Sequence, residues 1–502
     1  MKVTEGSAGL RTYAVRGLFW SALQRTGSQA IGLVAFVLLS RLLPPSAFGV
    51  LAMANVYLLA VLLLVEHGVS QAIVQRGQLE GHHLDAALGL SVVLSVLLML
   101  LTIGLAAPLA SLFREPLLEP VLRWLSPTIL LSGLRATQIA ILQRQLRFRE
   151  LAIRSTVSET FAGIVGIGMA SVGLGVWSLV GQALARGAVG VMVLWSVSGW
   201  RPRPVFRIGP AREIVSFGLP VLADRLVALV MGKADDLAIG LALGTTALGH
   251  YSVGYRGLTY LTMLIAGTVQ PIAFTVLSRL QAEPERFRRV FLTTVHYLCL
   301  GGFPVFVVVA FVAPFAVPLA LGPNWSEAVP VIQILSLAGA AKLAGLPTST
   351  ALVAAGRPGT QLRLNSAITL LSLLGFAAVV RSGIAAVALV HLAAGLLAIP
   401  VNAVVLRRAF DIQAGAYLAA NRLALVGVLL MSAVLGPLAA SWAGQIPTPL
   451  ALLGAVVVGS VVYLGTTFFL GRGSYVRARH ALGQGFPAEP IVIVPETEAP
   501  LP

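Results

Sequence analysis

The sequence is poor in charged residues and has almost no cysteine. Only 11% of its 502 residues are Asp, Glu, Lys or Arg, whereas 57% are hydrophobic, and the mean hydropathy is +0.90. A soluble chain of this length could not cover its surface with so few charges, so the composition predicts a polytopic membrane protein. The single cysteine, Cys299, excludes an intramolecular disulfide.

Acidic residues are the scarcer of the two charges. The chain has 19 Asp and Glu against 35 Lys and Arg, a formal net charge of +16. In a membrane protein such an excess gathers in the cytoplasmic loops. We therefore do not expect nucleic-acid binding.

Several chemical signatures are also missing. The sequence has no metal-ligand spacing, no glycine-rich loop of the nucleotide-binding kind and no nucleophile with a suitable base. It therefore predicts no metal, no cofactor, no enzymatic chemistry and no direct coupling to ATP. Residues 1–16 are polar and the apolar run after them is too long for the core of a signal peptide, so we expect no cleavable signal.

Long apolar runs dominate what is present. A helix needs about 20 residues to cross ~30 Å of hydrocarbon, and these runs are too long and too uniformly apolar for barrel strands. We predict an all-α polytopic fold of about fourteen transmembrane helices. The predicted spans are 17–43, 48–66, 86–112, 121–142, 156–174, 177–199, 213–243, 248–278, 290–321, 328–355, 361–380, 383–406, 418–441 and 447–470.

Basic residues mark every second connection between these spans. Clusters follow the fourth, sixth and eighth spans, at Arg144–Arg154, Arg201–Arg212 and Arg279–Arg289, whereas the alternate connections hold few. This alternation predicts a multi-pass protein of the cell membrane with both termini cytoplasmic. The outward loops are short, which weighs against a polytopic glycosyltransferase or ligase that works through a large external loop.

A shift of the chain by 200 residues places the first span on the seventh. Arg25 then aligns with Arg225, and Gly49 with Gly249. Six spans per half is an even number, so the halves would be parallel repeats with the substrate site between them near mid-depth. The predicted boundaries are 1–16 (cytoplasmic N-terminus), 17–200 (N-terminal six-helix bundle), 201–212 (basic cytoplasmic linker), 213–406 (C-terminal six-helix bundle), 407–470 (two additional helices) and 471–502 (disordered cytoplasmic tail).

The span 213–243 carries many charges for a membrane helix. Asp224, Arg225, Lys233, Asp235 and Asp236 interrupt its apolar run. One charge at the bilayer centre costs at least ~2.5–3.5 kcal/mol on insertion scales, so such residues are usually paired or face water. We therefore predict that this span lines a polar pathway. A structural ion-pair network between packed helices is the alternative.

Three blocks of the sequence resemble the bacterial polysaccharide-biosynthesis flippases. They are Gln143–Arg149 followed by 166–184, RLLPPSAFGVLAM at 41–53, and the glycine-spaced run from Asp235 to Tyr251. Over roughly residues 10–410 the chain is similar to the Wzx-type exporters of lipid-linked oligosaccharides, in the subgroup that includes the colanic-acid and teichuronic-acid exporters. These belong to the multidrug/oligosaccharidyl-lipid/polysaccharide exporter superfamily. The resemblance implies two six-helix bundles in a pseudo-twofold, V-shaped arrangement, plus two C-terminal helices.

For such a flippase the site must bind the diphosphate of the lipid carrier. Arginine and lysine suit this because they replace its hydration, and guanidinium offers forked contacts to phosphate oxygens. Carboxylates beside them would hold the cations in place when substrate is absent. The candidate substrate-binding residues are Arg25, Arg225, Lys233, Asp235, Asp236, Arg256 and Lys342. Basic residues outside the seventh span could instead snorkel to an interface, and Glu159 and His391 are either proton relays or hydrogen-bonded structural groups.

The resemblance implies a transporter that flips an undecaprenyl-diphosphate-linked oligosaccharide across the cytoplasmic membrane by alternating access, for cell-surface polysaccharide biosynthesis. Its expected partners are the lipid bilayer, the lipid-linked glycan, a coupling ion (proton or sodium) and polysaccharide polymerase or chain-length machinery. The alternatives are a peptidoglycan-precursor flippase and a multidrug cation antiporter on the same fold. The antiporter should present acidic and aromatic groups to its substrate, whereas cations outnumber acids in these spans.

Overall fold

The computed structural model describes residues 27–75, 81–202, 229, 232–442 and 447–471. Within these ranges every regular element is a helix, so the predicted all-α fold is confirmed. In this described part, ten helices are long and apolar enough to cross a membrane, or eleven when the bent α9 is counted as one span.

The helices follow the predicted spans closely. In chain order they are Gly27–Leu42, α2 (Pro45–Gln75), α3 (Gly81–Phe113), α4 (Leu118–Leu125), α5 (Pro127–Arg144), α6 (Phe148–Ser171), α7 (Val176–Val197), α9 (Ala234–Arg279), α10 (Pro284–Ala320), η1 (Pro323–Trp325), α11 (Ala328–Ala354), α12 (Pro358–Val379), η2 (Val380–Ser382), α13 (Ile384–Phe410), α14 (Ala414–Trp442) and α15 (Thr448–Leu470).

Two of the predicted spans contain a break in the helix. The span 121–142 divides into α4 and α5 at Ser126, because Pro127 has no N–H to continue the first helix and instead begins the second. The span 213–243 is interrupted at Lys233, whose φ of −124° is not helical, and α9 begins at the next residue. Asp235 and Asp236 then fall in the first turn of α9, where the helix dipole favours carboxylates.

Within α9 the chain folds back on itself at Gly244. This residue has φ 83° and ψ −171°, a conformation open to glycine because it lacks a Cβ. Gly240 and Leu248, on opposite sides of the turn, lie against each other as a result. The predicted seventh and eighth spans therefore meet in a hairpin with almost no loop between them.

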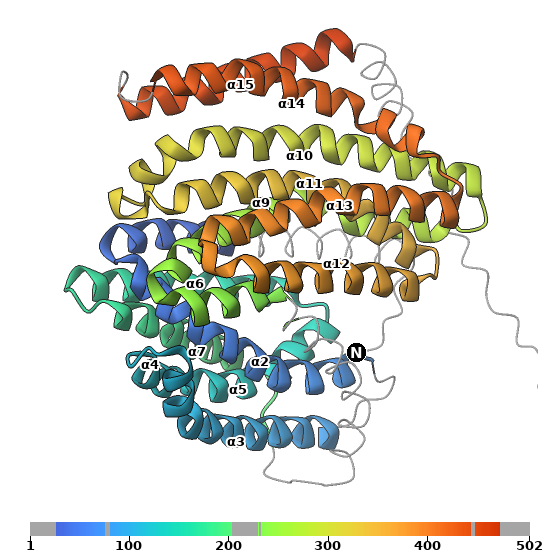
Figure 1. Cartoon of the computed structure of the whole chain (residues 1–502). Helices are drawn as coiled ribbons and strands as arrows, with labels where there is room; N and C mark the ends of the chain where they lie inside the picture. The colour runs from blue at the N-terminus through green and yellow to red at the C-terminus, as the bar shows by residue number, and fades with distance from the viewer. Residues whose placement is uncertain (1–26, 76–80, 203–228, 230–231, 443–446, 472–502) are drawn as a thin grey trace, which may run out of the picture.

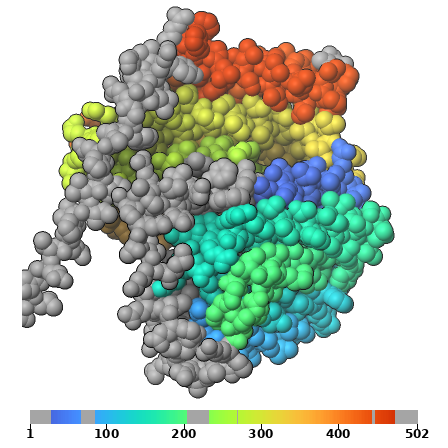
Figure 2. Space-filling view, turned by 180° about the vertical axis from the view of Figure 1, so that it is seen from behind, coloured from blue at the N-terminus to red at the C-terminus, as the bar shows by residue number. Residues whose placement is uncertain are grey.

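The helices fall into two groups that lie on opposite sides of the molecule. Figure 1 shows the blue-to-teal helices of residues 27–197 on one side and α10 to α13 on the other, with α14 and α15 packed on the outer face of α10. Figure 2 shows the same two groups from behind, with the blue, teal and green atoms below and the yellow and red atoms above. Helices α2 and α9 pack against each other where the two sides meet. The division at 17–200 and 213–406 remains our prediction.

The crossing of α2 and α9 depends on two glycines that are 200 residues apart. A Cβ on Gly49 would overlap the carbonyl oxygen of Thr245, and a Cβ on Gly249 would overlap the carbonyl oxygen of Pro45. The contact is reciprocal, since positions 45 and 49 meet positions 245 and 249. The 200-residue offset read from the sequence thus relates positions that touch in space, and both glycines are required for the close approach.

Further contacts join the two sides at the same end of the molecule. Buried Trp325 donates its indole N–H to the carbonyl oxygen of Ser40 at 2.8 Å, and its ring lies edge-on to Phe48 with centroids 5.3 Å apart. Thr245 donates its hydroxyl to Glu115 at 3.3 Å. This end is therefore closed by backbone contact, an aromatic cluster and hydrogen bonds.

Candidate functional site

Asp235 lies deep in the molecule, inside the hairpin of α9. It precedes Gly244 by nine residues, which is about 14 Å along a helix axis. Half of the ~30 Å hydrocarbon layer is about 15 Å. If the turn lies at the membrane surface, Asp235 is close to mid-depth.

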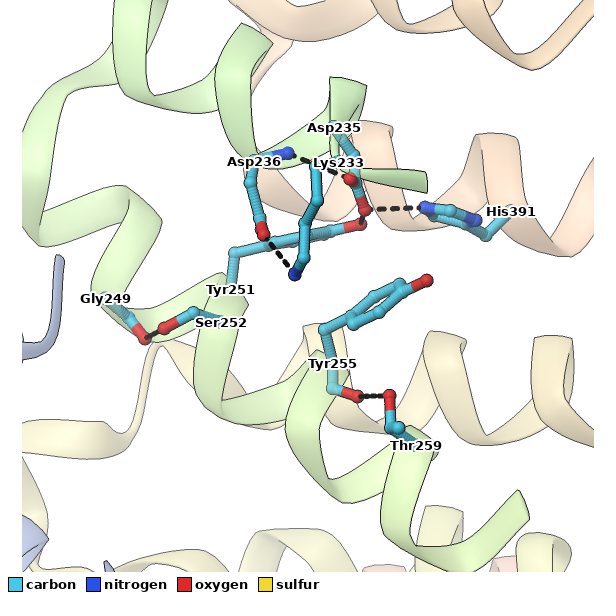
Figure 3. Close-up of polar contacts among 9 residues, drawn as sticks. All are labelled: Lys233, Asp235, Asp236, Gly249, Tyr251, Ser252, Tyr255, Thr259 and His391. Carbon is cyan, nitrogen blue, oxygen red and sulfur yellow. Dashed lines mark hydrogen bonds and ion pairs between the residues drawn. The ribbon is translucent and has the colours of Figure 1, made fainter. Parts of the chain in front are cut away.

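The carboxylate of Asp235 ties three helical segments together. Tyr251, on the returning arm of α9, donates its hydroxyl to Oδ2 at 2.7 Å. His391 of α13 places Nε2 3.0 Å from the same oxygen. In a straight helix Asp235 and Tyr251 would be about 24 Å apart, so this bond exists only because the chain turns at Gly244. Asp235 is 3% exposed, and Figure 3 shows these partners around it.

Lys233 and Asp236 form an ion pair beside this group. Their Nζ and Oδ2 atoms are 2.7 Å apart, and the Lys233 ammonium also lies 5.5 Å from the centre of the Tyr255 ring. Asp236 donates its backbone N–H to Oδ1 of Asp235 at 2.9 Å. The two carboxylates, adjacent in sequence, are therefore bound differently: Asp236 to a cation, and Asp235 to a hydroxyl and an imidazole (Figure 3).

Aromatic rings enclose the imidazole of His391. The centroid of Tyr255 is 5.6 Å from it, and that of Phe376, on α12, is 5.0 Å from it on another side. The Asp235 cluster therefore lies where α9, α12 and α13 converge.

A cavity of about 920 Å³ opens in front of this cluster. Among the described residues, its wall carries three cations, Lys233, Arg256 and Lys342, against one carboxylate, Asp236, so this described part has a formal net charge of +2. The rest of the wall is mostly apolar and comes from the first helix, α2, α9 and α11. The guanidinium of Arg256 lies over the ring of Phe36, 4.7 Å from its centre, which fixes it against the first helix.

A smaller cavity of about 290 Å³ adjoins the first. Arg256, Tyr260 and Asn55 line both of them. On its far side are Glu159 of α6 and Arg186 of α7, which form an ion pair with 2.9 Å between Oε1 and Nε.

The sequence-predicted residues divide into three groups. Lys233, Asp236, Arg256 and Lys342 line the larger cavity. Asp235 is buried next to it. Arg25 and Arg225 lie outside the described residues. Whether the grouped residues bind substrate stays a prediction.

Tyr251, Tyr255 and the partnership of Asp235 with His391 were not predicted from the sequence. The last joins positions 156 residues apart, and no local pattern encodes such a distance. Tyr251 had a weak signal, because the family-like run begins at Asp235 and ends at Tyr251, and these two residues are hydrogen-bonded.

Comparison with known protein families identifies the family of this chain. The model of a family described as "Polysaccharide biosynthesis protein" matches residues 38–330, more than half of the chain. The chain belongs to this family. The matched region holds Lys233, Asp235, Asp236 and Arg256 of the site, whereas Lys342 and His391 lie beyond it.

Relatives in the polysaccharide biosynthesis family come from different bacteria. The succinoglycan biosynthesis transport protein ExoT of Rhizobium meliloti is 23% identical over 64% of this chain and 65% of its own length. The lipopolysaccharide biosynthesis protein WzxC of Escherichia coli is 23% identical over 71% and 73%. The teichuronic acid biosynthesis protein TuaB of Bacillus subtilis is 24% identical over 73% and 76%.

Among solved structures the fold is similar to that of the lipid II flippase MurJ in an inward closed conformation. The TM-score is 0.74 at 14% identity, covering 91% of this chain and 99% of the other. An inward-facing multidrug transporter of the MATE family matches with a TM-score of 0.60 at 16% identity, over 78% and 98%. At these identities the likeness concerns the fold alone.

Proposed function

We propose that this protein is a transporter, not an enzyme, and that it flips an undecaprenyl-diphosphate-linked oligosaccharide from the inner to the outer face of the cytoplasmic membrane for cell-surface polysaccharide synthesis. The observation that carries the proposal is the 920 Å³ cavity with Lys233, Arg256 and Lys342 in a largely apolar wall. The names of the three relatives, each tied to the synthesis of a surface polysaccharide, support it.

The cavity supplies what a lipid diphosphate needs to leave water. Three cations replace the hydration of the phosphate oxygens, and Arg256 can contact two of them with one guanidinium. The apolar wall suits the first part of the isoprenoid chain, while the remainder stays in lipid. Without substrate, Asp236 neutralises Lys233 at 2.7 Å, so an entering phosphate competes with a carboxylate for that cation.

The direction of opening follows from the predicted orientation. With both termini cytoplasmic, the crossing of Gly49 and Gly249 lies at the outer end, and the cavity between α2, α9 and α11 is open toward the cytoplasm. Alternating access would separate this crossing and close the opposite end. Polysaccharide polymerase or chain-length machinery would then receive the glycan on the outer side.

We further propose that the coupling ion is a proton and that Asp235 carries it together with His391. The carboxylate is buried and bound by groups that exchange protons, a phenol and an imidazole, at 2.7 and 3.0 Å. Lys233, Asp236, Tyr255 and Lys342 are the other titratable groups nearby, so the balance of charge at the cavity depends on this proton.

Flipping can be measured on purified protein in liposomes that contain a labelled undecaprenyl-diphosphate-linked oligosaccharide. We expect the double variant Arg256→Ala, Lys342→Ala to lose at least tenfold in rate, because each charge-assisted hydrogen bond contributes about 1.5–3 kcal/mol and ~1.4 kcal/mol is a factor of ten. The matched control is Arg289→Ala, which removes an exposed arginine at the start of α10.

Normal flipping by a folded double variant would exclude this cavity as the site. Absence of any flipping by the wild-type protein, under conditions in which it remains folded, would exclude the function. A multidrug antiporter is disfavoured by the same observation that supports the proposal, since a net positive cavity repels organic cations.

A further inference from the structure

We propose that the smaller cavity is a subsite for the sugar that is attached directly to the diphosphate, and that it selects an uncharged, hydroxyl-rich ring. This rests on the proposed function and names which part of the substrate each cavity holds. Three features of the smaller cavity support this assignment: its position, the hydrogen-bonding character of its wall and the charge of one side chain within it.

The position follows from the residues that the two cavities share. Arg256 and Tyr260, one helical turn apart on α9, line both. A diphosphate held by Arg256 would thus place its next substituent in the smaller space. That space has a volume of about 290 Å³, at the lower end of the ~300–1,000 Å³ range of small-molecule pockets.

The wall of the smaller cavity is rich in groups that both donate and accept hydrogen bonds. Gln29, Asn55 and Gln182 each present an amide to it. An amide offers an N–H donor and a carbonyl acceptor side by side, which matches the hydroxyl of a sugar because that group also does both. The larger cavity also has two amides, Asn55 and Gln270, and it differs in carrying the ammonium groups of Lys233 and Lys342, which only donate.

Glu159 places a negative charge in the smaller cavity, whose wall also carries Arg186 and Arg256. Its Oε1 is paired with Arg186, but its Oε2 is buried and has no hydrogen-bond partner among the described residues. Gly32 lies next to this oxygen, at a place where a Cβ would come within 3.9 Å of it. The negative charge of the carboxylate repels a phosphate or an acidic sugar.

The ion pair also explains why Arg186 does not turn the cavity into a second phosphate site. Its charge is already met by Glu159 at 2.9 Å. Among the described residues, the larger cavity therefore adds Lys233 and Lys342 to the Arg256 that both cavities share, whereas the smaller cavity adds amides and the pair of Glu159 with Arg186. We assign the diphosphate to the larger cavity and the sugar to the smaller one.

The experiment measures binding to full-length protein in nanodiscs with three probes that share one lipid tail. They are undecaprenyl diphosphate esterified with methyl, with glucose and with glucuronic acid. The methyl ester carries the same diphosphate charge as the glucose ester and lacks only the ring. We expect the wild-type protein to bind the glucose probe about tenfold more tightly than the methyl probe, the effect of one or two net hydrogen bonds, and the glucuronate probe no more tightly than the methyl probe.

Two variants test the wall. Gln182→Ala should reduce the tenfold preference for glucose to about threefold or less without changing the affinity for the methyl probe. Glu159→Gln, which keeps the size of the side chain, should raise the affinity for the glucuronate probe about tenfold, since it removes the repulsion. Gln143→Ala, an exposed glutamine at the end of α5, is the matched control and should alter none of the three affinities.

Each failure has a separate meaning. Equal affinity of the wild-type protein for the glucose and methyl probes, or an unchanged preference in folded Gln182→Ala, overturns the sugar subsite. Loss of the proposed function would be seen with the methyl probe alone, as no binding, or as binding that Arg256→Ala does not weaken.

Discussion

The crossing of α2 and α9 offers the sharpest test of how the two sides of the molecule are held together. A methyl group at Gly249 would overlap the carbonyl oxygen of Pro45, and a methyl group at Gly49 would overlap that of Thr245. Both obstacles are backbone atoms, which cannot rotate out of the way. Gly249→Ala should therefore separate the helices rather than be absorbed by a change of rotamer.

This overlap determines how far Gly249→Ala should reduce the population in which the crossing is closed. An extra methyl group in a close-packed contact costs about 1–3 kcal/mol, and ~1.4 kcal/mol is a factor of ten. The population with the crossing closed should fall roughly 5- to 150-fold relative to the open one. Gly49 and Gly249 lie at the same crossing. The free-energy cost of closing the crossing in the double variant should therefore be larger than in either single variant but smaller than the sum of the two single costs.

The population can be followed by pulsed electron spin resonance. Cys299 is the single cysteine, and Cys299→Ala gives a background in which spin labels can be placed at Ser46 and Thr246, close to the crossing. Gly249→Ala should add or enlarge a long-distance component. The matched control is Gly257→Ala, also on α9, where a Cβ would have no atom within 4 Å. An unchanged distance distribution in a folded Gly249→Ala protein would refute the view that this contact closes this end of the molecule.

Three other outcomes are expected. Lys233→Met should lower the unfolding temperature in detergent, because it leaves Asp236 without its cation. The expected loss in free energy of unfolding is about 2 kcal/mol, since Lys233 is partly exposed. Adding Asp236→Asn should restore most of this loss. Trp325→Phe should remove the hydrogen bond to Ser40 and about 1 kcal/mol with it, which spin labels near the crossing would register as a weaker form of the Gly249→Ala effect. Asp235→Asn should bring flipping driven by a pH gradient down to the rate without a gradient, while affinity for the undecaprenyl methyl diphosphate probe is retained; a preserved response to the gradient would exclude Asp235 as the proton carrier.

Much of this fold could be predicted because the bilayer sets the length of an apolar run. The predicted spans 290–321 and 328–355 correspond to α10 (Pro284–Ala320) and α11 (Ala328–Ala354) within a few residues. The position of the hairpin at Gly244 was also nearly predicted, because the spans that end at 243 and start at 248 leave almost no loop between them. The break in the helix at Lys233 was not expected, because the hydropathy of a segment carries no information on its backbone dihedral angles.

The candidate site was only partly predictable. Charge inside an apolar run identified Lys233 and Asp236, which need partners wherever they lie in a membrane. The pairing of Glu159 with Arg186 joins two helices, and that of Asp235 with His391 spans 156 residues. Such pairings depend on which helices become neighbours, and a single sequence carries little information on that.

The hairpin of α9 has a mechanical consequence. Its two arms are joined at the tip by the turn at Gly244 and again, about 14 Å away along the helix, by the hydrogen bond from Tyr251 to Asp235. We expect an element braced at both points to resist bending and to move as one body. One end of it carries Gly249 and the crossing with α2, and the other carries Lys233 at the cavity. A displacement of the crossing should thus be transmitted over about 14 Å to Lys233.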